Sequence, residues 1–240
     1  MAKLDISEKQ RADYCYTARV LRDLLYSMNA VVLKVYDYSG SEHPGDLDVF
    51  VSSEDLLKFI KRASEMLKAK IVRTKRFLTS SYQLISPELP LEIDVYYVME
   101  FSPSLAIYRI SGRERMNIPW CSDTLDVPVL RKGLDSFFIL FHAIRHKRFT
   151  QYEIRTLINR ICSFTHEALV EFITYVKRSD LELETLASLY TIALIMLNER
   201  KFKDAKCYSN ILMLLKYLRR YGVDQTPRSP IRYLTRYLSG

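Results

Sequence analysis

The hydrophobic pattern of this 240-residue chain changes near residue 100, and that change most restricts its fold. Before it, short apolar runs with a period of two alternate with stretches whose apolar residues recur every three or four positions. This indicates strands interleaved with helices. Beyond an irregular segment the helical period continues almost to the end. The sequence therefore predicts an α+β protein, in which a mixed β-sheet with flanking helices precedes an α-helical bundle.

The pattern divides the chain into residues 1–100, 101–128 and 129–240. The first part is predicted to be a compact sheet domain, the second a connector because prolines interrupt it, and the third a helical domain. The expected helices cover 7–28, 165–178, 182–198, 204–221 and 230–238. Apolar stripes predict three more, from Leu56 to Leu67 after a cap at Ser52 or Ser53, from Leu134 to Ile144, and up to Ile161 after a cap formed by Thr150 and Glu153. The expected strands cover 31–36, 46–51, 70–76, 82–85 and 91–98.

Several classes of protein are excluded by composition. The chain has only six glycines, so it lacks a glycine-rich dinucleotide fingerprint, and Gly40 and Gly45 are followed by Asp46 instead of the lysine of a P-loop. No apolar run approaches the roughly 18 to 20 residues of a membrane span, and the amino terminus has no apolar signal core. We therefore expect a cytoplasmic protein without membrane contact.

The net charge of +8 is concentrated in two segments. Residues 101–160 carry 10 basic and 5 acidic groups, and residues 201–240 carry 9 and 2. Such an excess is typical of a protein that binds a polyanion such as a nucleotide or RNA. Charge alone favours the simpler interpretation, a solvated basic surface.

The four cysteines, at positions 15, 121, 162 and 207, are too far apart in sequence to form a CxxC element. We expect buried or unreactive thiols.

The most informative motif is Gly45-Asp46-Leu47-Asp48-Val49-Phe50-Val51. Because strand side chains alternate between faces, Asp46 and Asp48 share one face and the apolar residues share the other. Two adjacent carboxylates are costly unless a cation lies between them, and Mg²⁺ prefers such ligands.

A third acid, Asp94, lies in another apolar strand, Leu91-Glu92-Ile93-Asp94-Val95-Tyr96-Tyr97. Adjacent strands would bring Asp94 to the other two acids and form a cluster able to hold two metal ions. Either motif alone is more typical of a solvated strand end. Their combination favours a metal site, because acids are disfavoured in strands.

In these residues the chain resembles the DNA polymerase beta-like nucleotidyltransferase superfamily, and specifically its minimal members that are followed by a helical domain. The matching features are Gly40-Ser41, Asp46-Leu47-Asp48 and Asp94, and the resemblance covers about the first 100 residues. Only four residues separate Ser41 from Asp46, fewer than is usual in that family.

The resemblance implies transfer of a nucleoside monophosphate from a nucleoside triphosphate, ATP first, to a hydroxyl of RNA, a protein or a small molecule. Asp46, Asp48 and Asp94 would be the catalytic and metal-binding residues, with Mg²⁺ or Mn²⁺ as cofactor. The triphosphate would be bound by Gly40 and Ser41, or by basic residues, for which the candidates are Lys34, Arg73, Lys75 and Arg76.

Acceptor contact is predicted for basic residues near the carboxy terminus, where arginines alternate with tyrosines at helical spacing. The candidates are Arg219, Arg220, Arg232 and Arg236. An alternative interpretation explains the same pattern: the tyrosines pack the last helix against the protein, and the arginines stay in solvent.

Three alternatives stay open. The first is a catalytically inactive protein of the same fold that binds nucleotide, RNA or a protein partner. The second is a helical ribonuclease, which requires Arg160 and His166 to meet. The third, a metal site at His142 and His146, lacks a third ligand in the sequence, so a partly buried pair is favoured.

Overall fold

A computed structural model describes residues 6–39, 42–76, 79–87, 89, 91–102, 105–121, 124–146, 149–179, 181–198 and 205–222. It divides into two compact units, residues 1–131 and 132–240. The first contains the sheets and the second is helical, so the predicted α+β class is confirmed.

The first unit is organised around a mixed seven-stranded sheet with the strand order β3-β4-β5-β2-β1-β9-β8. A separate antiparallel pair, β6 and β7, accompanies it. The strands are β1 (Ala30–Val32), β2 (Asp46–Val51), β3 (Lys70–Arg76), β4 (Thr79–Ile85), β5 (Glu92–Tyr96), β6 (Met99–Ser102), β7 (Leu105–Ile107), β8 (Arg113–Asn117) and β9 (Asp126–Leu130).

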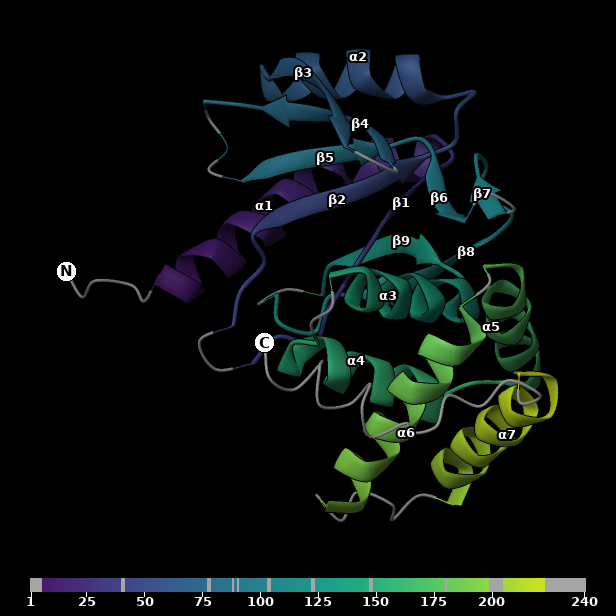
Figure 1. Cartoon of the computed structure of the whole chain (residues 1–240). Coiled ribbons are helices and arrows are strands. Elements are labelled where there is room, and N and C mark those ends of the chain that lie inside the picture. The colour runs from purple at the N-terminus through teal and green to yellow at the C-terminus, as the bar shows by residue number, and fades with distance from the viewer. Residues whose placement is uncertain are drawn as a thin grey trace. The chain divides into compact units, whose positions relative to one another are not determined.

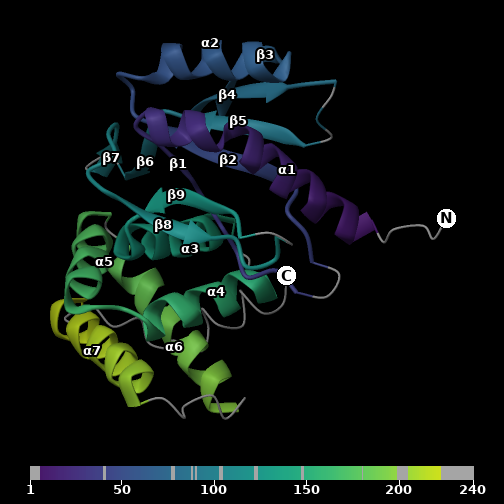
Figure 2. The same ribbon diagram turned by 180° about the vertical axis from the view of Figure 1, so that it is seen from behind.

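Two amphipathic helices, α1 (Ile6–Ser27) and α2 (Leu56–Leu67), pack on the apolar side chains of this sheet. Figures 1 and 2 show α1 crossing one face of it. Alternation along β2 directs Leu47, Val49 and Val51 into this core. The acids between them are therefore directed to the opposite face.

The start of α2 and the predicted connector differ from the sequence predictions. The N-cap of α2 is Asp55, whereas the Ser52 hydroxyl accepts a hydrogen bond from the amide of Ile110. Where the sequence predicted an irregular connector, β8 and β9 extend the main sheet. Prolines misled the prediction: Pro128 lies inside β9, and Pro119 lies in the turn before it.

The second unit contains helices whose ends largely match the predicted ones. They are α3 (Lys132–His146), α4 (Gln151–Cys162), α5 (His166–Arg178), α6 (Glu182–Asn198) and α7 (Ala205–Gly222). The predicted capping box is present, with Thr150 and Glu153 bonded reciprocally at the start of α4. The predicted helix at 230–238 lies outside the described residues. None of the helices in the described part of the chain is long and apolar enough to cross a membrane.

All four cysteines are paired, which corrects the expectation of thiols. Cys15 of α1 is bonded to Cys121, and Cys162 at the end of α4 is bonded to Cys207 of α7. The partners are 106 and 45 residues apart in sequence, so spacing gave no indication of the pairing. Each bond joins elements that are distant in the chain.

The Cys15–Cys121 bond should stabilise the first unit strongly, because it closes a loop with a sequence separation of 106. Loss of a crosslink over ~100 residues costs about 4–5 kcal/mol in the chain-entropy model. We predict that Cys15→Ser/Cys121→Ser lowers the free energy of unfolding by this amount. Denaturation followed by fluorescence of Trp120, the single tryptophan, measures it.

Thiol titration is the control. Wild-type protein unfolded without reductant should show no reactive thiol, and four after reduction. Four reactive thiols without reductant would contradict the pairing.

Candidate functional site: an acidic cluster with an internal lysine

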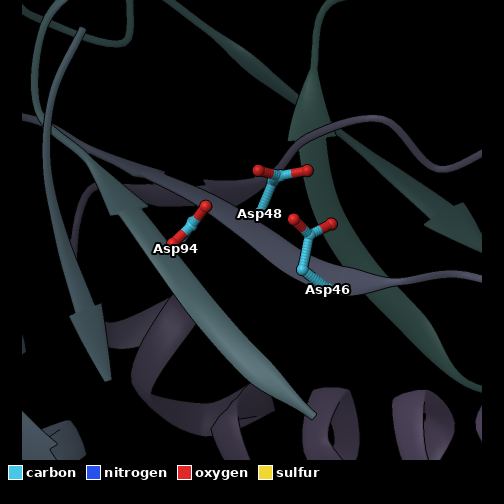
Figure 3. A group of neighbouring side chains, drawn as sticks. All are labelled: Asp46, Asp48 and Asp94. Atoms are coloured by element: carbon cyan, nitrogen blue, oxygen red, sulfur yellow. The ribbon is translucent and has the colours of Figure 1, made fainter. Parts of the chain in front are cut away.

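The predicted acids converge because β2 and β5 are parallel neighbours. In their register Asp48 lies directly opposite Asp94, and Asp46 lies opposite Glu92. The three aspartates each offer a carboxylate oxygen within 4.8 Å of the others. Figure 3 shows the carboxylates gathered from the two adjacent strands. We call Asp46, Asp48 and Asp94 the acidic triad.

The triad lies where solvent reaches it poorly. Asp48 and Asp94 are 4% and 2% exposed, and Asp46 is half-buried. Charged oxygens that are buried need a positive partner or hydrogen bonds. The triad is therefore a place where a cation stabilises the structure.

The donors in the triad fit a hard divalent cation. Ligands on opposite sides of Mg²⁺ lie about 4 Å apart, and one carboxylate oxygen from each acid of the triad lies within 4.8 Å of the others. The buried Oδ1 of Asp48 has no hydrogen-bond partner among the residues that the structure describes. A buried carboxylate oxygen without a hydrogen-bond partner is suited to bind a metal ion, because buried polar atoms are normally paired.

Lys34 supplies part of the positive charge. Its Nζ lies 2.6 Å from Oδ2 of Asp48, and its side chain is 13% exposed. The amide of Leu33 donates to the carbonyl of Asp48 at 2.9 Å, which places the lysine beside the aspartate. Lys34 has a φ of 54°, and this left-handed backbone costs a non-glycine residue about 1–2 kcal/mol. The ion pair offsets this cost.

The electrostatics keep Lys34 protonated. Burial acts to lower the pKa of its ammonium, but the charges of Asp48 and Asp46 outweigh burial and raise the pKa. The Lys34 ammonium therefore interacts with all three carboxylates of the triad. A divalent ion held by the triad would add positive charge beside the same carboxylates.

Two tyrosines beside the triad were missed by the sequence analysis. The hydroxyl of Tyr96 donates to Oδ2 of Asp94 at 3.4 Å. Burial first, and then the nearby aspartates, raises the pKa of both Tyr96 and Tyr14, so both phenols stay protonated. The spacing Asp94-Val95-Tyr96 was a usable signal, because it puts both polar residues on one face. Nothing in the sequence linked Tyr14 to the triad.

The other predicted nucleotide-binding residues do not all join the triad. In the strand register Arg73 of β3 lies opposite Tyr82 of β4, which lies opposite Val95 of β5. Val95 and Asp94 are on opposite faces of the sheet, so Arg73 is on the face away from Asp94. Gly40 and Ser41 lie outside the described residues, as do the side chains of Lys75 and Arg76 in β3.

The predicted acceptor residues belong to the last part of the chain. Arg232 and Arg236 lie outside the described residues, and so do the side chains of Arg219 and Arg220, whose backbone belongs to α7.

The alternative sites in the helical unit have structural roles. Arg160 forms an ion pair with the buried Asp135 at 3.1 Å, while His166 is exposed at the start of α5. His142 lies 3.3 Å from Glu153 of the capping box. Burial opposes ionisation of Glu153, but bonds from His142 and Thr150 prevail and lower its pKa. In the described part of the chain, the acidic triad is the only group with the geometry for a metal.

Comparison of the chain with protein-family models, curated proteins and solved structures found no match.

The lysine should compete with a metal for the triad. We predict that Lys34→Met binds Mn²⁺ roughly tenfold or more tightly than wild type, because a neighbouring positive charge is removed. Asp48→Asn should bind Mn²⁺ much more weakly, because a charged ligand is lost. Calorimetric titration of metal-stripped protein measures both.

Lys58→Met, which removes an exposed lysine of α2, is the matched control and should bind Mn²⁺ like wild type. Equal Mn²⁺ affinity in wild type, Lys34→Met and Asp48→Asn would exclude the triad as the metal site.

Proposed function

We propose that this protein is a metal-dependent nucleotidyltransferase that moves a nucleoside monophosphate from ATP or a related triphosphate to an acceptor hydroxyl. The observation that carries the proposal is the convergence of Asp46, Asp48 and Asp94 on adjacent parallel strands. These are also the residues of the nucleotidyltransferase resemblance. A merely solvated set of acids would not be buried and aligned in this way.

The proposed cofactor is Mg²⁺ or Mn²⁺, held by the triad. When bound, it neutralises charge on the attacking and leaving oxygens of the phosphate. The acceptor oxygen forms a bond to the α-phosphorus, and the bond to pyrophosphate breaks. Asp94 is the proposed acceptor of the hydroxyl proton, and the Tyr96 hydroxyl, which donates to Asp94, orients that carboxylate.

Lys34 is proposed to have two successive partners. In the free protein it compensates the charge of Asp48. With metal and triphosphate present, its ammonium is suited to a phosphate oxygen, because lysine binds phosphate as a point charge. This is the phosphate-binding role that the sequence predicted for it.

The same ion pair favours a second candidate function. A lysine that permanently replaced the metal would make the protein a catalytically inactive relative that binds nucleotide, RNA or a protein partner. Metal titration of Lys34→Met and wild type separates the two candidates, because a permanently lysine-filled triad binds Mn²⁺ only after the lysine is removed.

We also propose a cytoplasmic location, where nucleoside triphosphates are available. Disulfides are rare in that compartment except in hyperthermophiles. The chain has only five asparagines and four glutamines, and such a shortage of heat-labile amides is typical of thermophilic proteins. The two disulfides agree with this origin.

The transfer activity should depend on each aspartate. We predict that Asp48→Asn and Asp94→Asn, incubated with α-labelled ATP, Mn²⁺ and total RNA or protein acceptors, lose label incorporation by on the order of 10²–10³-fold or more. The physical reason is that asparagine keeps the shape of the ligand and removes its charge.

Asp23→Asn is the matched control, because Asp23 is an exposed acid of α1 away from the triad. It should transfer label like wild type. Undiminished transfer in folded Asp48→Asn would overturn the proposal.

A further inference from the structure

A groove of about 410 Å³ lies along the amino-terminal half of α1, and the acidic triad does not line it. Its floor and walls come from α1 and from Trp120, which precedes the disulfide-bonded Cys121. The volume is in the usual range for small-ligand sites. Cys15 lines the groove, so the disulfide ties the two walls together.

Aromatic rings form one part of this groove. The indole of Trp120 is fixed, because Nε1 donates to the carbonyl of Tyr36 at 3.0 Å and the ring packs on Tyr14 with centroids 4.9 Å apart. The ring of Tyr38 contacts the same indole edge-on, with ring centroids 5.5 Å apart. Tyr16, by contrast, is 57% exposed in the groove. A held ring beside an exposed ring is suited to stacking of flat bases.

Arginines form another part. Arg11 and Arg19 both line the groove and outnumber the single acid there, Glu8. The Nε of Arg11 donates to the carbonyl of Glu42 at 3.0 Å, which orients its guanidinium. Eight residues of helix separate the two arginines by about 12 Å along the axis, which corresponds to between three and four base steps of about 3.4 Å. The groove therefore fits an anionic ligand with aromatic parts.

One loop connects the groove to the triad. It leaves the triad at Lys34, and two residues later the Tyr36 carbonyl holds Trp120. The Glu42 carbonyl holds Arg11, and four residues later the loop reaches Asp46. Four residues span at most about 14 Å, so Glu42, which holds Arg11 of the groove, lies within that distance of Asp46 of the triad.

We infer that the groove binds the 3′ end of a single-stranded RNA, with bases stacked on Tyr16 and Trp120 and phosphates on Arg11 and Arg19. The inference rests on the proposed function in one respect, since it makes the terminal hydroxyl of this RNA the acceptor. It assigns acceptor binding to α1, whereas the sequence pattern predicted the carboxy-terminal arginines.

The test is anisotropy of a fluorescein-labelled 12-nucleotide oligo(A) RNA with a free 3′ hydroxyl, titrated with full-length protein in EDTA. Tyr16→Ala/Arg19→Ala should weaken RNA binding at least about tenfold, through lost stacking and one lost phosphate contact. Its plot of log affinity against log salt should also flatten by about 0.7. A structural role alone would leave that slope unchanged.

Tyr108→Ala/Arg62→Ala, a matched pair of exposed residues outside the groove, should bind RNA like wild type. Wild type that fails to bind RNA, or groove and control variants of equal affinity, would overturn the inference. Equal affinity is also the outcome if the groove takes a protein acceptor.

Asp48→Asn separates this inference from the proposed function. It should keep RNA affinity and lose transfer. If RNA binding depends on the groove but wild type transfers no label, the groove inference is supported and the proposed transfer reaction is overturned. If the groove variants keep both transfer and RNA affinity, the proposed reaction is supported and the groove inference is overturned.

Discussion

The parallel pairing of β2 with β5 is the constraint on which the site depends. Because the two strands run in the same direction and in register, Asp48 and Asp94 are direct neighbours, and alternation adds Asp46 on the same face. A shift of one residue would turn Leu47 and Val49 out of the core and the acids into it. The packing of α1 and α2 against the other face therefore holds the acidic triad in place.

Lys34 places a positive charge inside this cluster. A buried carboxylate is costly without a positive partner, and the Lys34 ammonium lies 2.6 Å from Asp48. The left-handed backbone at Lys34 is the conformational cost of that contact. An internal cation that can be displaced suits a site that must bind and release metal and nucleotide, and a permanent one suits a binding protein.

The sequence predicted the amino-terminal strands and the shared face of Asp46 and Asp48 because both depend on alternation, which is local. It predicted β2 and β3 to the residue, and it joined Asp94 to the other acids only on the condition that their strands are neighbours, which the pairing of β2 with β5 meets. It could not predict the contacts that depend on tertiary structure. The ion pair of Lys34, the opposite-face placement of Arg73 and the bond between Cys15 and Cys121 all join residues whose proximity no local pattern encodes.

The central claim is that Asp46, Asp48 and Asp94 form one metal site. Anomalous diffraction from crystals grown with Mn²⁺ and a non-hydrolysable ATP analogue tests it most directly. The account predicts a manganese peak within about 2.0–2.4 Å of an oxygen from each aspartate, with the Lys34 ammonium moved from Asp48 toward phosphate. A triad without manganese, with Lys34 still bonded to Asp48, would contradict it.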